Sequence, residues 1–464
     1  MLPLTRRKPV SYNIRVKKHK KGTIQMKTEK TYASVFELNG RPRFGEAFPL
    51  ALQHVVAMIV GCVTPAIVIA GVAGLNGKDQ VILVQSALFI AAVSTLIQLF
   101  PIAGKIGSGL PVIMGVSFAY LPSMQAIAGS FDIATILGAQ LIGGIVAIFV
   151  GIFVTKLRVL FPPLITGTVV FTIGLSLYPT AVKYMAGGAS SPDYGSWKNW
   201  LVGFLTLFVV IGLNHFGKGI CKLASILIGM MVGYIVSIFF GMIDFSAVGS
   251  AGLFQIPQPL HFGMKFEVSA IVTMVILFVI NSVQAIGDFS ATTGGGLDRE
   301  PTDRELSGGI VAYGISNIFG SFFGGLPTAT FSQNVGIVAT TKVVNRMVLG
   351  LAAVILLFAG FMPKFSALLT TIPQCVLGGA TISVFATIAM TGIKLVTQQP
   401  LSYRNTSIVG LAVALGMGIT QCSDALAAFP AWVTTVFGKS PVVVTTIVAI
   451  ALNLILPKEK TQEK

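Results

Sequence analysis

Hydrophobic residues lie along this chain in long apolar segments separated by short polar loops. We place fourteen such segments in the sequence, and most are long enough to cross a bilayer as a helix. The predicted fold class is therefore an all-α polytopic membrane protein. The segments cover about residues 48–74, 80–101, 110–128, 132–155, 159–181, 198–215, 220–241, 266–291, 307–323, 332–345, 347–370, 375–395, 404–422 and 438–457.

The third and tenth segments are interrupted by glycine, proline and polar residues. The third opens with Gly-Leu-Pro at 109–111, and the tenth follows the same tripeptide at 325–327, an offset of 216 residues and seven segments. Broken backbone at membrane depth is tolerated where it is buried in protein or lines a cavity, and paired broken segments mark transporter sites. We expect short extended stretches here, and an inverted repeat because seven is an odd number.

Composition agrees with a membrane protein and gives its orientation. Of 464 residues, 54% are hydrophobic and 10% are charged, against about 25% charged in soluble domains. Much of the net charge of +16 lies in residues 1–45, a tail that suits anionic lipid and lacks the patterned aromatics of a nucleic-acid binder. Counting both tails, Lys and Arg divide 26 to 6 between the two sides, which predicts cytoplasmic termini in the plasma membrane.

Motifs of enzymes and metal sites are missing from the sequence. The four cysteines are scattered without metal spacing, and no Walker loop, GxSxG, HExxH or pair of intramembrane acids occurs. The first 45 residues hold no apolar run long enough for a cleavable signal peptide. We therefore expect neither an enzyme, nor a cofactor, nor a metal.

Several polar side chains fall inside apolar segments, where they are costly and typically functional. Asn281, Gln284 and Asp288 share one face of the eighth segment. Asp288 either meets a substrate or caps the broken segments. His54, which follows Gln53, either relays protons or ties two helices together by hydrogen bonds.

The broken stretches end in Ser117-Phe118 and Gln333-Asn334. If each precedes a short helix, free backbone N–H groups face one another across a site that favours anions and carbonyl oxygens. Gln333 offers one acceptor and two donors, which suits a flat ligand edge that alternates N–H and C=O. Phe118 is suited to stacking on a planar ring, although core packing is the commoner role.

The chain resembles the nucleobase–ascorbate transporter family over about residues 35–457. The tenth segment fits the signature of that family, and short strings in the first, third and eighth segments fit as well. These residues are Gln333-Asn334-x-Gly336 with Thr341-Lys342, then Gln53-His54, Gly115-x-Ser117-Phe118 and Ile286-Gly287-Asp288.

The resemblance implies a seven-plus-seven inverted repeat that works by elevator-type alternating access. Segments 1–4 and 8–11 form a core that holds substrate, and segments 5–7 and 12–14 form a gate that dimerises. The implied boundaries are a tail at 1–45, core at 46–157 and 264–371, gate at 158–243 and 372–457, and a tail at 458–464.

In the family, glutamine at the first signature position goes with oxopurines, so the resemblance implies xanthine or urate as substrate, with proton coupling. The implied substrate contacts are Gln284, Gln333, Phe118 and Ser117. The implied residues of organisation or coupling are His54, Asp288, Asn334, Gln53 and Tyr313.

Two positions depart from the family pattern, because Gln284 and Tyr313 stand where relatives have acids. An amide both donates and accepts and does not repel an anion, so we expect a substrate with an acceptor or negative charge, such as urate. Coupling then either runs through Asp288 and His54 or is lost in a facilitator. The alternatives are an anion transporter of the related sulfate-permease fold and, from another class, a non-transporting receptor.

Overall fold

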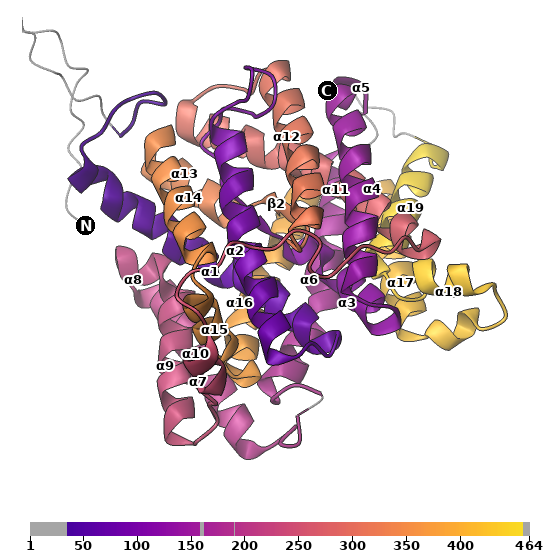
Figure 1. Ribbon diagram of the computed structural model, residues 1–464. Helices are drawn as coiled ribbons and strands as arrows, with labels where there is room; N and C mark the ends of the chain where they lie inside the picture. The colour runs from indigo at the N-terminus through magenta and orange to yellow at the C-terminus, as the bar shows by residue number, and fades with distance from the viewer. Residues whose placement is uncertain (1–34, 158–161, 190, 458–464) are drawn as a thin grey trace, which may run out of the picture.

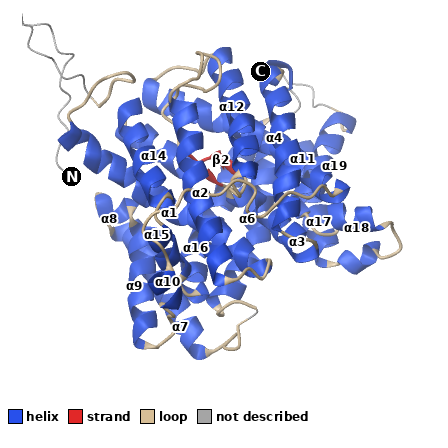
Figure 2. Ribbon diagram, viewed as in Figure 1, coloured by secondary structure: helices blue, strands red, loops and turns tan. Residues whose placement is uncertain are grey.

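The computed structural model describes residues 35–157, 162–189 and 191–457. Figure 1 shows a bundle of helices, and Figure 2 shows a small pair of strands at its centre. Most of the basic N-terminal tail, at 1–34, and the C-terminal tail at 458–464 lie outside the described residues.

Seven of the described helices are long and apolar enough to cross a membrane, or eight if the bent pair α14–α15 is counted as one span. The chain is thus a mostly helical, multi-pass membrane protein. Fourteen spans and an inverted repeat remain predictions. The seven helices are α1 (Phe44–Val72), α2 (Gly77–Leu99), α4 (Ile133–Ile152), α6 (Pro163–Met185), α7 (Trp197–Phe216), α11 (Val268–Thr292) and α16 (Gln374–Val396).

The remaining elements are shorter, less apolar, or bent. The predicted single segment at 347–370 is two helices that meet at an angle of 84° just before Pro363, because a proline disfavours helical geometry in the residue that precedes it. These elements are α3 (Leu121–Ser130), α5 (Val154–Leu157), α8 (Ile220–Leu223), α9 (Ser225–Phe239), α10 (Ser246–Ser250), α12 (Asp303–Phe322), α13 (Ser332–Thr341), α14 (Arg346–Gly360), α15 (Pro363–Thr370), α17 (Tyr403–Gln421), α18 (Ala431–Phe437) and α19 (Pro441–Ile455), with single turns η1 (Phe118–Tyr120), η3 (Thr293–Leu297) and η4 (Ser423–Leu426).

The two interrupted segments begin as extended chain, as predicted. Strand β1 (Met114–Val116) pairs antiparallel with β2 (Thr328–Thr330), and Gly115 lies opposite Ala329. Each strand leads into a short helical element, η1 followed by α3 after β1, and α13 after β2. The pairing satisfies backbone groups that would otherwise be unpaired at membrane depth.

Side chains from neighbouring helices hold both strands in place. Thr95 on α2 accepts a hydrogen bond from the Met114 N–H at 2.9 Å and donates to the Met114 carbonyl at 3.2 Å. Asn317 on α12 accepts from the Thr328 N–H at 2.8 Å and donates to the Thr328 carbonyl at 3.2 Å. Buried polar side chains thus complete the hydrogen bonding that a two-stranded sheet leaves open.

Helix packing falls into two groups, and the strand pair packs against α1, α2, α11 and α12 of the first group. In the first group, α4 packs against α11 and α12, and α2 packs against α1 and α14. In the second group, α6 packs against α16, α7 against α9, and α17 against α19. Helices α6 and α16 approach closely, because a Cβ atom at Gly167 would lie 2.7 Å from the carbonyl oxygen of Gly392.

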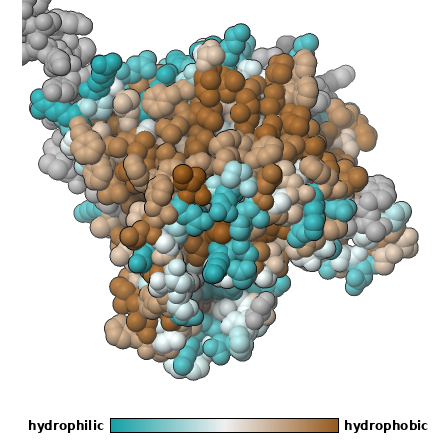
Figure 3. Space-filling model, in the orientation of Figure 1, coloured by the Kyte–Doolittle hydropathy of each residue, from teal (hydrophilic) through white to brown (hydrophobic). Residues whose placement is uncertain are grey.

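The segment between α10 and α11, residues 251–267, crosses the outside of the first group (Figure 1). The Leu260 N–H donates to the Phe322 carbonyl at 2.6 Å, and the Lys265 N–H donates to the Ala134 carbonyl at 3.0 Å. Figure 3 shows this face as largely apolar, with a cluster of hydrophilic residues across its middle. A surface of this kind suits contact with lipid.

Candidate functional site

A cavity of about 100 Å³ lies where the two broken segments meet α11, α6 and α16. All four predicted substrate contacts line it, although they come from three separate parts of the chain. The lining residues are Ser117, Phe118, Ala119, Val170, Ile173, Gln284, Thr330, Phe331, Ser332, Gln333, Val384 and Ile388.

The two glutamines supply the polar groups of the cavity. Gln284 on α11 is half-buried, and its buried Oε1 atom has no hydrogen-bond partner within the described residues. Gln333 is also half-buried and lies in the first turn of α13. A buried amide oxygen without a partner loses the energy of a hydrogen bond, so Gln284 is poised to accept one from a ligand.

Asp288 lies behind the cavity rather than in its lining. Its carboxylate is buried and accepts hydrogen bonds from both hydroxyls that flank Phe331: Thr330 Oγ1 donates to Oδ2, and Ser332 Oγ donates to Oδ1 at 2.8 Å. These hydrogen bonds connect α11 to the turn between β2 and α13. Both roles considered for Asp288, contact with a substrate and organisation of the broken segments, stay predictions.

His54 and Asn334 form a second buried link between elements. Asn334 Nδ2 on α13 lies 3.0 Å from His54 Nδ1 on α1 and donates to the His54 carbonyl at 3.1 Å. Both side chains are buried. The contact ties two helices together, and a proton-relay role for His54 stays a prediction. Gln53 is half-buried beside it and is not among the residues that line the cavity.

Tyr313, for which the family resemblance implies organisation or coupling, is not among the residues that line the cavity. Its side chain is buried on α12, where its hydroxyl is hydrogen-bonded to that of Tyr120 and its ring lies 5.5 Å from that of Phe278. A large aromatic side chain gains more from this apolar cluster than a carboxylate would. Tyr313 therefore contributes packing, and its implied role in organisation or coupling stays a prediction.

Two aromatic rings shape the cavity. The buried Phe118 ring meets that of Phe385 on α16 edge-on at 5.1 Å. Phe331, which the sequence did not single out, lies between Gly61 and Gly115, where an added Cβ would come within 2.9 and 2.6 Å of its ring. The sequence feature that could have identified Phe331 as a residue of the site is its position at the end of β2, directly before the polar residues Ser332, Gln333 and Asn334. The absence of side chains at the two glycines leaves room for this ring.

The N-terminus of α13 points a positive partial charge at the cavity. The helix begins at Ser332 after Phe331, and it carries no acid in its first turn. The Asn334 N–H already donates to the Phe331 carbonyl at 3.0 Å, whereas the N–H groups of Ser332 and Gln333 have no acceptor within the helix and so favour an anion or a carbonyl oxygen. On the other side, Ser117 Oγ accepts from the Ala119 N–H at 3.2 Å and caps η1.

The polar groups of the cavity are amides, hydroxyls and backbone N–H groups, which are suited to reversible binding of a small ligand. Within the part of the chain that the structure describes, no group of three or more His, Cys, Asp or Glu side chains could hold a metal ion.

A multi-pass fold with a small cavity between two broken segments is typical of a membrane transporter. The chain belongs to the Permease family (Xan_ur_permease), whose family model matches residues 45–424. As a permease of that family, the protein is a transporter and not an enzyme.

Curated relatives match nearly the whole chain. The chain is 36% identical over 421 residues to uric acid permease PucJ of Bacillus subtilis (strain 168), covering 89% of this chain and 93% of that protein. It is 34% identical over 417 residues to the xanthine permease of the same organism, covering 89% and 94%. It is 32% identical over 446 residues to xanthine permease XanQ of Escherichia coli (strain K12), covering 92% and 95%.

Solved structures share the fold at low sequence identity. The transmembrane domain of a cyanobacterium bicarbonate transporter, BicA, matches with a TM-score of 0.58 and 18% identity, covering 88% of this chain and 98% of that one. SLC26A9 matches with a TM-score of 0.59 and 12% identity, covering 89% and 66%. At such identities the likeness concerns the fold.

Proposed function

We propose that this protein carries an oxopurine, xanthine or urate, across the plasma membrane. The observation that carries the proposal is the convergence of Gln284 and Gln333 on one small cavity beside Phe118. Two amides provide donors and acceptors for the edge of a purine, and an aromatic ring covers its face. The names of the relatives, xanthine and uric acid permeases, support the same substrate class.

Gln284 decides between the two oxopurines. Its unpartnered Oε1 accepts a hydrogen bond, its Nε2 amide group donates, and the side chain carries no charge that repels an anion. We expect the Gln284→Glu variant to lose urate uptake by on the order of tenfold or more, because a carboxylate removes the donors and adds like charge. Radiolabelled uptake of xanthine and urate in cells measures the change.

Gln398→Glu, on the exposed surface after α16, is the matched control and should transport as the wild type does. An unchanged ratio of urate to xanthine uptake in Gln284→Glu would contradict the role of Gln284. A thermal-shift screen of the purified protein against xanthine, urate, guanine, hypoxanthine, adenine and uracil tests the substrate class directly, because a ligand stabilises the native state that binds it.

The proposed mechanism is elevator-type alternating access in an inverted repeat of fourteen segments. The two packing groups correspond to a core, at 46–157 and 264–371, and a gate, at 158–243 and 372–457. The core would carry the cavity and slide against α6 and α16. Both termini are proposed to be cytoplasmic, and the gate is proposed to form a homodimer. Cysteine accessibility in intact cells tests the orientation, and chemical crosslinking tests the dimer.

Proton coupling is proposed to run through Asp288 and His54, which are the buried titratable groups beside the broken segments. Asp288 contacts the turn that holds Ser332, so a change in its charge would alter the cavity. Uptake with and without a protonophore tests coupling: uptake that a protonophore leaves unchanged identifies a facilitator instead.

An inorganic-anion transporter is the second candidate. It is favoured by the α13 N-terminus that points into the cavity and by Gln284 in place of an acid. The thermal-shift screen separates the two candidates when sulfate and bicarbonate are included, because each predicts a different stabilising ligand. A non-transporting receptor would bind oxopurine and show no uptake.

A further inference from the structure

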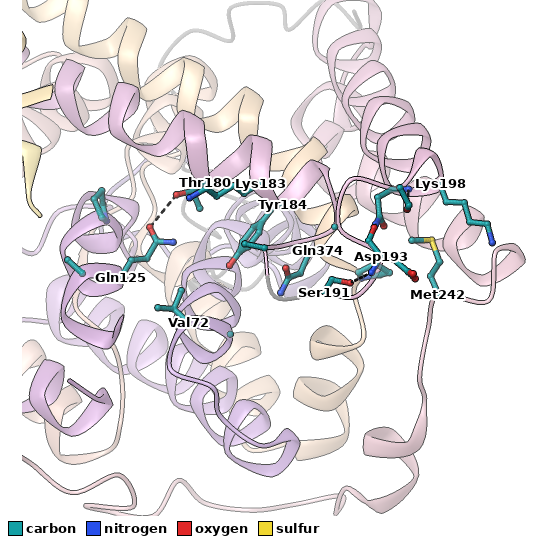
Figure 4. A pocket seen from close by; sticks show the side chains of 18 of the residues that line it. Val72, Gln125, Thr180, Lys183, Tyr184, Ser191, Asp193, Lys198, Met242 and Gln374 are labelled. Atoms are coloured by element: carbon teal, nitrogen blue, oxygen red, sulfur yellow. Dashed lines mark hydrogen bonds between the residues drawn. The ribbon is translucent and has the colours of Figure 1, made fainter. Parts of the chain in front are cut away.

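A second and larger hollow, of about 1030 Å³, opens beside the proposed site, and we call it the vestibule. Its walls include the C-terminal ends of α1 and α6, the middle of α3, residues 187–189 and 191–196, and the starts of α7 and α16. Figure 4 shows Gln125 and Thr180 joined by a hydrogen bond at one end, with Tyr184 and Gln374 between them and the loop that carries Asp193.

The vestibule and the cavity share two helices, α6 and α16, and the continuous segment formed by η1 and α3. Phe118 and Ala119 in η1 line the cavity, and Pro122 and Gln125, about one turn further along in α3, line the vestibule. On α6, Ile173 lines the cavity and Thr180 the vestibule, about 10 Å further on at 1.5 Å per residue. The vestibule is therefore the space that a solute crosses before it reaches the cavity from this side.

Two hydrogen bonds join α3 to the second packing group near these spaces. Helix α3 itself packs against α1 and α4 of the first group. Thr180 Oγ1 donates to Gln125 Oε1 at 3.3 Å, which joins α6 to α3. The hydroxyls of Ser123 and Ser440 lie 2.8 Å apart, which joins α3 to the start of α19. A relative movement of the two groups would therefore break both bonds.

Positive charge predominates in the lining of the vestibule. Lys183, Lys198 and Lys439 line it against a single acid, Asp193. The ion pairs found among the described residues include none of these three lysines, although Lys439 Nζ donates to Ser130 Oγ at 2.6 Å. A hollow lined by one sign of charge between low-dielectric walls concentrates counter-ions.

We propose that the vestibule is an anion-selecting antechamber, which gathers a planar organic anion such as urate before it enters the cavity. This inference rests on the proposed function, and it adds a selection step outside the central site. The side-chain amide of Gln374 in the same wall provides hydrogen bonds to a heterocycle while the lysines hold its charge. On the proposed topology, the vestibule opens to the outside of the cell.

The test uses the full-length chain with Lys183→Gln, Lys198→Gln and Lys439→Gln combined, and the Lys→Arg triple variant as the matched control. Uptake is measured below saturation in slightly acidic buffer, where urate is an anion and xanthine is neutral. We expect urate uptake to fall by on the order of tenfold in the glutamine variant and to lose its dependence on ionic strength. Xanthine uptake and the arginine variant should match the wild type.

A cysteine reporter measures the electrostatic potential in the vestibule independently of transport. Ala189 lines the exposed part of the wall, so Ala189→Cys is placed in a background in which Cys221 and Cys422 are serine. The rate of modification by a sulfonate-bearing methanethiosulfonate is divided by the rate for a trimethylammonium-bearing one in intact cells. The ratio should fall by on the order of tenfold when the three lysines become glutamine.

Each failure has a distinct meaning. An unchanged reporter ratio, or an equal fall of urate and xanthine uptake, overturns the antechamber while leaving the oxopurine permease in place. The proposed function is contradicted if the wild-type protein takes up neither xanthine nor urate and neither compound raises its melting temperature. A reporter ratio that falls as expected in such a protein still supports anion selection by the vestibule.

Discussion

The two broken segments that meet at the cavity have similar backbones and different side chains. After β1 the chain continues through the apolar turn Phe118–Tyr120, and α3 then contacts the other packing group through Ser123. After β2 it continues through Ser332, Gln333 and Asn334, which contact Asp288, the cavity and His54. The first segment therefore provides an apolar wall and a link between the groups, and the second provides the polar groups that meet a ligand.

The difference extends to the glycines. Gly115 in β1 has no room for a side chain, since an added Cβ would lie 2.6 Å from the Phe331 ring. Gly336 in α13 is exposed, and an added Cβ would meet no atom within 4 Å. The wall segment is thus tightly packed, whereas one face of the polar segment borders open space.

The largest effect is expected for Gly115→Val. The valine side chain would displace Phe331 or separate the paired strands. Overpacking of this kind typically lowers the free energy of unfolding by about 1–3 kcal/mol, and occasionally by more. We expect a thermal melt far below that of the wild type, or no folded protein at all. Gly336→Ala is the matched control and should melt at or above the wild-type temperature, because alanine favours the helix by about 1 kcal/mol. Equal melting of both variants would contradict the comparison.

A second test separates the two roles within α13. Asn334→Ala removes both hydrogen bonds to His54 and leaves buried acceptors unpaired, which costs about 1–3 kcal/mol of folding free energy. Gln333→Ala, one residue earlier, removes only a cavity group. We expect the Asn334→Ala variant to melt at a lower temperature than the wild type. The Gln333→Ala variant should melt like the wild type without ligand, but its melting temperature should no longer rise when ligand is added. The reverse pattern would refute this assignment.

The link made by the first segment is tested by a double-mutant cycle. Ser123→Ala and Ser440→Ala each break one hydroxyl pair, and their coupling should amount to about 1 kcal/mol, as for a typical hydrogen bond. The cycle is measured by thermal unfolding in detergent. Ser237→Ala with Ser440→Ala is the control pair, because the Ser237 hydroxyl on α9 donates to the Gly233 carbonyl of its own helix. Strictly additive effects are expected for the control pair and would contradict the link if the first pair showed them.

Local sequence patterns predicted the extended stretches, since broken, polar backbone within apolar segments is tolerated only where it is buried in protein or lines a cavity. The family resemblance, not the local pattern, implied that Gln284 and Gln333 meet at one site. Contacts between distant residues were not predictable. Tyr313 pairs with Tyr120, which lies 193 residues away, and the sequence gives no sign of that contact. The bend before Pro363 was missed for a different reason, because the apolar character continues through it and only the proline marks it.

One ion pair lies just after each of the short helices α3 and α13, and the two pairs differ in their exposure to solvent. Lys265 pairs with Asp132 after α3, and Lys342 pairs with Asp298 after α13; the side-chain exposure of the aspartates is 41% and 78%. Burial opposes ionisation of Asp132, but hydrogen bonds from Lys265 and Thr135 outweigh it and hold the pKa of Asp132 below its ordinary value.

The smallest effect is therefore expected at low pH. Because the pKa of Asp132 is lowered in the folded state, its charge stabilises the protein above the ordinary pKa of aspartate, and that contribution is lost as the pH falls through the lowered value. Solvent screening limits it to less than about 1 kcal/mol. Asp132→Asn can still accept from the Thr135 N–H, so it should melt slightly lower than the wild type near neutral pH and equal to it in acid. Asp298→Asn should change the melting temperature less at every pH, because its more exposed pair is screened more strongly. If the Asp132→Asn difference persisted undiminished in acid, the ion pair would not be its cause.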